Sequence, residues 1–304
     1  MFINLLQIFV ENLLPIFLAA GVGVLLAWKT NVEAKHLSRV LFFVFSPSLM
    51  FSLIMDSVSP DLPIGRIAFV VILTILIVSG VVFLIGKLMK YDKEMIIAMM
   101  IPALSMNTGN MGLPICLFVF GELGLTYAGF VLIANVTMTY TFGVAIASMG
   151  KQDIKTALLG LFKLPMIYAV ALGFILVYTG LSVPTPIMRA VDLLAEASIP
   201  VMLVLLGMNL QKANLKAEVG ALSISVAARL LLGPIIAFLL APLAGLSGLA
   251  HQVTTVQCGM PGAVTSTVLA TEYDVKPSFV TAAVTIGTIL SPLTLTPIIW
   301  LLTK

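Results

Sequence analysis

Long apolar stretches alternate with short polar connections along the whole chain of 304 residues. A membrane-spanning helix needs about 20 mostly apolar residues, and ten stretches approach or exceed this length. Apolar residues fill whole stretches and do not alternate with polar ones, which favours helices over the strands of a membrane β-barrel. The pattern predicts an all-α polytopic membrane protein. The ten predicted transmembrane helices are residues 6–28, 37–55, 66–88, 94–121, 125–148, 156–179, 187–209, 218–243, 250–271 and 279–302.

Composition supports a membrane protein and excludes several functions. Of all residues, 60% are hydrophobic and 10% are charged, whereas a soluble domain is typically about 25% charged. So few charges cannot cover a water-exposed surface, which excludes disorder, nucleic-acid binding and a cytosolic enzyme. Two cysteines and two histidines, widely separated, cannot form a disulfide framework or a Cys/His metal cluster. We therefore expect no cofactor or metal, no nucleic-acid partner, and the lipid bilayer as the surroundings.

Basic residues of the loops are distributed asymmetrically. One set of alternating loops carries 12 Lys and Arg residues, and the opposite set carries only Arg66, Arg189 and Lys304. Because basic residues accumulate in cytoplasmic loops, the first set is predicted to be cytoplasmic. Ten spans then place both termini on the non-cytoplasmic side of the cell membrane. The 12 basic residues are Lys29, Lys35, Arg39, Lys87, Lys90, Lys93, Lys151, Lys155, Lys163, Lys212, Lys216 and Lys276.

The two halves of the chain share a pattern of Pro, Gly and apolar residues. This pattern predicts a duplicated unit of five helices, with residues 1–150 as the first repeat and residues 151–304 as the second. Five is odd, so the second copy crosses the membrane in the opposite direction, as in secondary transporters built from inverted repeats. The alternative is chance matching among abundant Leu, Gly and Pro. The matching segments are Leu14–Pro15, Ala19, Gly23 and Leu26 with Leu164–Pro165, Ala169, Gly173 and Leu176, Pro47 with Pro200, and Gly112–Pro114 with Gly259–Pro261.

The fourth and ninth spans are interrupted at corresponding places. Polar residues and glycines lie among residues 103–114, and a similar mixture lies among residues 254–263. Proline removes a backbone N–H donor and glycine lets a helix unwind. Such a break is tolerated in a membrane only where protein buries it or a wet cavity adjoins it. Paired breaks in two halves of a transporter indicate its binding site; the alternative is two proline kinks held to neighbouring helices by polar residues.

The chemistry of the breaks favours an anionic ligand. A new half-helix is expected after each break, with Pro114 or Pro261 near its first position, where proline is favoured. The unpaired N–H groups and positive dipole end of that half-helix suit a carboxylate. The carbonyl groups that end each preceding half-helix suit a cation or a substrate N–H. Asn107 and Asn110 add amide groups, and Gln257 is the repeat counterpart of Asn110.

Charged residues inside the seventh and eighth predicted spans form a candidate charge network. Arg229 is near the middle of the eighth span, and Asp192 and Glu196 are one helical turn apart in the seventh. An Arg at the centre of a membrane costs at least about 2.5–3.5 kcal/mol and normally has a partner or a wet path. We expect Arg229 to pair with Glu196 as a structural neutraliser. The alternative is that Arg229 attracts anions or belongs to the coupling machinery.

A further set of motifs extends over nearly the whole chain: Leu37–Arg39, Pro47–Phe51, Asn107–Gly109, Gly112–Pro114, Gly121, Ile199–Pro200, Gly207, Arg229–Leu230, Pro234, Met260–Pro261, Tyr273 and Ser291–Thr294. Together they resemble the auxin efflux carrier family, which includes plant PIN auxin carriers and bacterial carriers of malonate or malate. The resemblance implies a scaffold domain and a transport domain, with the fourth and ninth helices crossing at their prolines. It also implies a carboxylate substrate at the crossing, elevator-type alternating access and a homodimer.

One departure from the family pattern narrows the resemblance. Plant carriers commonly have a long cytosolic insert between the repeats, and here only residues 149–156 lie there. The resemblance is therefore stronger to the bacterial-type members than to the plant carriers.

These features predict a secondary active transporter of small mono- or dicarboxylates. The alternative is a sodium-coupled symporter of a bulkier organic acid, similar to bile-acid symporters, so coupling to H⁺ or Na⁺ stays open. An intramembrane enzyme would need paired acids, a His cluster or an activated nucleophile; none is evident, and we expect no enzyme. The predicted substrate-binding residues are Asn107, Asn110, Met111, Pro114, Gln257, Cys258, Met260, Pro261 and Gly262, and the predicted charge network is Arg229, Asp192 and Glu196.

Overall fold

The computed structural model describes residues 2–57, 62–148, 162, 164–210 and 218–304, and within them it is almost entirely helical. Extended pairing among these residues is limited to one isolated antiparallel bridge, between Met106 and Gly262. The elements are α1 (Phe2–Ile8), η1 (Phe9–Leu13), α2 (Leu14–Lys29), α3 (Ala34–Val40), η2 (Leu41–Phe45), α4 (Ser46–Ser57), α5 (Ile64–Leu88), α6 (Lys93–Leu104), η3 (Thr108–Gly112), α7 (Leu113–Met138), η4 (Thr139–Gly143), α8 (Val144–Ala147), α10 (Pro165–Thr179), α11 (Thr185–Glu196), α12 (Ser198–Leu210), α13 (Val219–Ala227), η5 (Ala228–Leu232), α14 (Gly233–Leu243), α15 (Gly248–Cys258), α16 (Val264–Glu272) and α17 (Pro277–Leu302).

Seven helical stretches of the described residues are long and apolar enough to cross a membrane, judged by length and composition. The prediction of an all-α polytopic membrane protein is therefore confirmed, whereas the ten-helix inverted repeat stays a prediction. The seven stretches are Leu5–Lys29, Ala34–Asp56, Ile64–Leu88, Thr108–Ala147, Thr185–Leu210, Val219–Leu243 and Pro277–Leu302.

The other predicted spans differ from these stretches for local reasons. The stretch Thr108–Ala147 combines the end of the fourth predicted span with the fifth, and its backbone turns at Gly121, where φ is 69°. The sixth span corresponds to α10, which has 15 residues; its predicted start lies outside the described residues. The ninth span is divided into α15 and α16 by a break at residues 259–263.

Prolines explain four of the five π-helical turns in the described part of the chain. The turns η1, η2, η3 and η5 each end two residues before a proline, namely Pro15, Pro47, Pro114 and Pro234. A proline cannot donate to the carbonyl four residues earlier, and its ring clashes with that carbonyl. A π turn, in which N–H groups bond five residues back, takes up the conflict while the helix continues.

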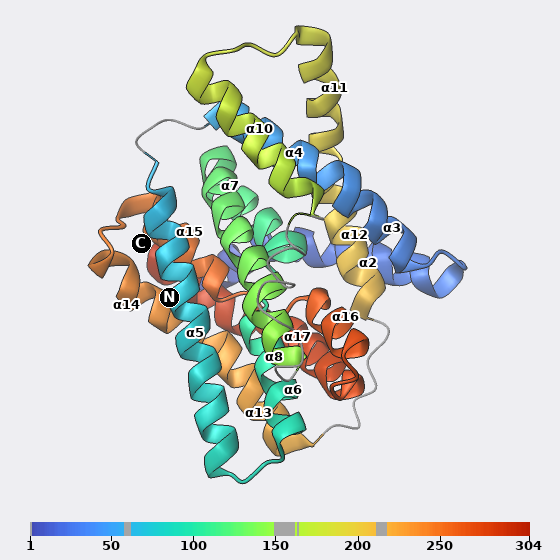
Figure 1. Cartoon of the computed structure of the whole chain (residues 1–304), viewed down its shortest axis with the longest axis vertical. Coiled ribbons are helices and arrows are strands. Elements are labelled where there is room, and N and C mark those ends of the chain that lie inside the picture. Colours follow the sequence, from blue (N-terminus) through green and yellow to red (C-terminus); the bar gives the residue numbers. More distant parts are fainter. Residues whose placement is uncertain (1, 58–61, 149–161, 163, 211–217) are drawn as a thin grey trace.

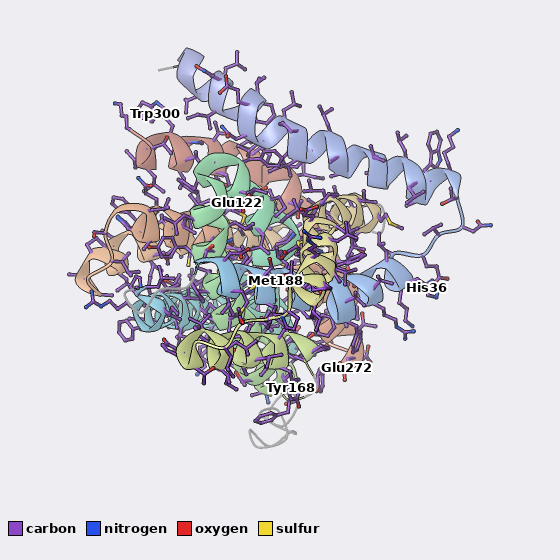
Figure 2. The ribbon with its side chains drawn as sticks, turned by 90° about the horizontal axis from the view of Figure 1, so that it is seen from above. His36, Glu122, Tyr168, Met188, Glu272 and Trp300 are labelled. Carbon is purple, nitrogen blue, oxygen red and sulfur yellow. The ribbon has the colours of Figure 1, made fainter. Side chains whose placement is uncertain are left out.

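The helices pack in two groups. In the first group, α2 packs against α12, and α4 packs against α10 and α11; in the second, α5, α6, α13, α14, α15 and α17 pack against one another. Figure 1 shows the first group above and to the right of the second. Figure 2 shows the helix formed by α1, η1 and α2 along one edge of the molecule, with Trp300 of α17 near its N-terminal end.

Glycines bring the backbones of α2 and α12 into direct contact. A Cβ atom added at Gly23 would overlap the carbonyl of Val204, and one added at Gly207 would overlap the carbonyl of Ala20. Small residues allow such close approach between helices in a membrane, where packing rather than the hydrophobic effect drives helix association. The two glycines thus allow the close spacing of α2 and α12.

Two sets of polar contacts each join segments that are distant in the sequence. Lys276 Nζ lies 4.0 Å from carboxylate oxygens of Asp92 and Glu94, so the loop before α6 adjoins the loop before α17. Arg66 Nη1 donates to the carbonyl of Gly245 at 3.0 Å, which joins the start of α5 to the turn after α14. This grouping agrees with the two sets of loops that the charge pattern distinguishes.

The contact between α2 and α12 yields a prediction. Replacing Gly23 with Ala should force the two backbones apart and lower the free energy of unfolding by about 1–3 kcal/mol, the usual cost of overpacking. The matched control is Gly21→Ala in the same helix, where nothing lies within 4 Å of the new Cβ. Thermal unfolding of both purified variants checks this, and equal melting temperatures would contradict the close approach.

Candidate functional site

The two breaks lie against each other and satisfy each other's backbone groups. The N–H of Asn107 donates to the carbonyl of Pro261 at 2.8 Å, and the N–H of Ala263 donates to the carbonyl of Ser105 at 2.8 Å. The two segments run antiparallel at this point. Polar backbone groups that leave a helix inside a membrane need partners within the protein, and here each break supplies them to the other.

The half-helices that follow the breaks begin at Thr108 and at Val264. The prediction that Pro114 and Pro261 lie near their first positions is wrong. Pro114 comes six residues after Thr108, behind the π turn η3, and Pro261 lies in the break itself. The physical reason is that a π turn accommodates a proline inside a helix, whereas the break requires extended backbone to form the bridge.

Asn135 of α7 holds the first break in place. Its Oδ1 accepts from the N–H of Met106 at 3.1 Å, and its Nδ2 donates to the carbonyl of Met106 at 2.8 Å and to Thr108 Oγ1 at 3.0 Å. Asn135 is not among the predicted site residues. The signal that could have found it is a lone amide in the apolar fifth span, because polar residues inside a membrane are usually functional.

A cavity of about 170 Å³ adjoins the crossed breaks. This is about 11 to 17 times the 10–15 Å³ that one water needs, so a small organic molecule fits. Its lining includes the first residues of both downstream half-helices, Thr108–Asn110 and Val264–Thr265. Asn135 and Tyr140 also line it, and none of its described lining residues is charged. The first N–H groups of a helix have no partner within the helix, so both half-helices present donors at this cavity.

The predicted substrate-binding residues divide between the cavity and the packed side of the crossing. Asn107 and Asn110 line the cavity. Asn107 is 3% exposed, and its Nδ2 has no hydrogen-bond partner among the described residues. The amide of Gln257 lies instead beside Gly112. The other predicted substrate-binding residues are buried but do not line this cavity: Met111, Pro114, Gln257, Cys258, Met260, Pro261 and Gly262.

Arg229 of η5 contacts both broken helices. Its Nη1 donates to the carbonyl of Ala103 at 2.8 Å, and its Nη2 donates to the carbonyl of Cys258. Ala103 lies in the last turn of α6 and Cys258 is the last residue of α15. The guanidinium therefore meets the negative dipole ends of the two half-helices that precede the breaks.

The predicted ion pair between Arg229 and Glu196 is wrong. Glu196 is exposed at the end of α11, and the carboxylate of Asp192 accepts a hydrogen bond of 2.7 Å from Ser52 of α4. Asp192 thus ties α11 to α4, and backbone carbonyls take the place of an acid beside Arg229.

Comparison with known proteins agrees with a multi-pass membrane protein. A family model described as membrane transport protein matches the chain twice, over residues 8–156 and 151–299. The chain belongs to this family, that of the auxin efflux carriers, as its motifs predict. It is therefore a membrane transporter, a class whose members are not usually enzymes.

Three relatives match most of the chain. An "Uncharacterized transporter" of Methanocaldococcus jannaschii is 29% identical over 277 residues, which cover 89% of this chain and 90% of the relative. An "Uncharacterized transporter" of Methanothermobacter thermautotrophicus is 27% identical over 261 residues, covering 85% and 86%. A "Putative malonate transporter" of Rhizobium meliloti is 23% identical over 275 residues, covering 88% and 86%.

The contacts of Asn135 yield a second prediction. Replacing it with Leu should leave the N–H and carbonyl of Met106 buried without partners, and each such group costs about 1–3 kcal/mol. The matched control is Thr137→Val, because the Thr137 hydroxyl bonds only to the carbonyl of Ile133 in its own helix, at 2.8 Å. We expect a clear loss of melting temperature for Asn135→Leu alone; equal losses would show that Asn135 does not hold the break.

Proposed function

We propose that the protein is a secondary active transporter of small organic anions, mono- or dicarboxylates, which bind at the crossed breaks. The observation that carries this proposal is that one cavity is lined by the first residues of two half-helices, Thr108–Asn110 and Val264–Thr265. Helix N-termini combine unpaired N–H donors with a positive dipole end, and they bind carboxylates and phosphates in many proteins. Two such ends at one cavity favour an anion.

The side chains of the cavity fit the same ligand class. The unpartnered Nδ2 of Asn107 is a donor for a carboxylate oxygen, and Asn110 lies within the same turn. With no charged residue in the described lining, the anion is held by amides and helix ends and leaves without breaking a direct ion pair. The name of the R. meliloti relative refers to malonate, a small dicarboxylate.

The proposed architecture is ten helices in two inverted repeats, residues 1–150 and 151–304. The double match to the family model and the antiparallel meeting of the two breaks support it. In an elevator mechanism, α2, α4, α10, α11 and α12 form the scaffold domain, through which two copies associate as a homodimer. The second packing group and the crossed breaks then form the transport domain, which carries the anion across the membrane.

The amide groups of the cavity yield a third prediction. Asn107→Ala and Asn110→Ala should each weaken malonate binding about ten- to a hundredfold, since a hydrogen bond to a charged group is worth about 1.5–3 kcal/mol. The matched control is Asn12→Ala, whose amide donates only to the carbonyl of Ile8 in the first helix. Binding is measured by calorimetry on purified protein, and transport by uptake into sealed vesicles.

Malonamide tests the charge of the ligand in the same assay. It has the shape of malonate without its charge, and it should neither bind with similar affinity nor compete for uptake. Equal binding of the acid and the amide would refute a site that selects negative charge and, with it, the organic-anion proposal.

The charge asymmetry of the loops yields a fourth prediction, on orientation in the cell membrane. Reporter fusions after Lys151 and after Lys304 should report opposite sides, the first cytoplasmic and the second non-cytoplasmic, because basic residues are retained in the cytoplasm. Both reporters on one side would overturn the ten-helix topology and the inverted repeat.

A further inference from the structure

The charge of Arg229 is balanced by helix ends. The side chain is 2% exposed, and the ion pairs found in the described part of the chain belong to Lys276, with Asp92 and Glu94. Each helix C-terminus carries about −0.5 elementary charge. The two ends that Arg229 contacts, at Ala103 and Cys258, therefore sum to about one negative charge and match the guanidinium.

The surroundings of Arg229 are shaped for a guanidinium. A Cβ atom at Gly233 would overlap Nη2 of Arg229 and the carbonyl of Cys258, so only glycine leaves room for this contact. One turn earlier in the same helix, Ser225 Oγ donates to the carbonyl of Met99 at 2.8 Å. The eighth span thus runs beside α6 over two successive turns, which places Arg229 at the carbonyl end of α6.

In secondary transporters with discontinuous helices, the carbonyl ends of half-helices commonly coordinate the coupling sodium ion. In this protein a side chain already holds both ends. We propose that Arg229 is a fixed cation that takes the place of a coupling sodium ion at the crossed breaks. It is a positioning residue: it holds the two half-helices so that the anion cavity forms without sodium. This inference rests on the proposed transport function and defines its ion dependence.

The test compares thermal unfolding of the ligand-free protein in sodium chloride and in choline chloride at equal ionic strength. The unmodified protein should have the same melting temperature in both. Arg229→Gln keeps hydrogen-bonding groups but removes the charge; it should melt lower in choline chloride and recover part of the loss in sodium chloride, because sodium can occupy the free carbonyl ends. Arg229→Lys keeps the charge and should stay insensitive to sodium.

Arg66→Gln is the matched control. Like Arg229, Arg66 donates to a backbone carbonyl, but to one only, that of Gly245 at 3.0 Å, and in an exposed turn. Its loss should create no sensitivity to sodium. If Arg229 only filled space, the melting temperature of Arg229→Gln should be as insensitive to sodium as that of this control. That result would overturn the proposal.

Malonate affinity of the unmodified protein gives a second measurement that does not depend on a folded variant. It should be equal in sodium chloride and choline chloride. A higher melting temperature or a tighter malonate affinity in sodium would overturn the inference. If malonate does not bind in either salt, the proposed substrate is wrong, and the unfolding of ligand-free protein still decides the role of Arg229.

Discussion

The structure depends on one requirement: polar backbone groups inside a membrane must find partners within the protein. Two interrupted helices would each leave such groups unsatisfied, and the hydrogen bonds of Asn107 and Ala263 across the crossing join one break to the other. Neither break is stable alone, so the two halves of the chain are tied together at this point. Asn135 and Arg229 contact backbone groups next to the bridge and restrict how the broken helices can shift.

The crossing also separates charge. The carbonyl ends of α6 and α15 meet at Arg229, and the N-terminal ends of η3 and α16 line the cavity. Four helix dipoles are thus arranged so that their negative ends face a buried cation and their positive ends face an open space. Arg229 lies against the negative ends, so the helix ends that face the cavity are the positive ones, although none of its described lining residues is charged.

The sequence predicts the helical class, the place of both breaks and the family, because Pro, Gly and Asn are conspicuous in apolar spans. It predicts the details less well where partners are backbone atoms. The pairing of Arg229 with Glu196 was inferred from opposite charges, whereas the partners are carbonyls that no residue type reveals. Asn135 was missed for the same reason. The start of the half-helix was misplaced because Pro114 marks a π turn and not the break.

That misplacement points to a physical relation between proline and function. Pro114 cannot donate to the carbonyl of Asn110, and Pro234 cannot donate to that of Leu230. The chain responds with the π turns η3 and η5, which contain Asn110 at the cavity and Arg229 at the helix ends. A π turn inserts one residue and rotates the side chains that precede the proline relative to those that follow it. The prolines therefore change the backbone a few residues before their own positions. There they set the orientation of Asn110 at the cavity and of Arg229 at the helix ends.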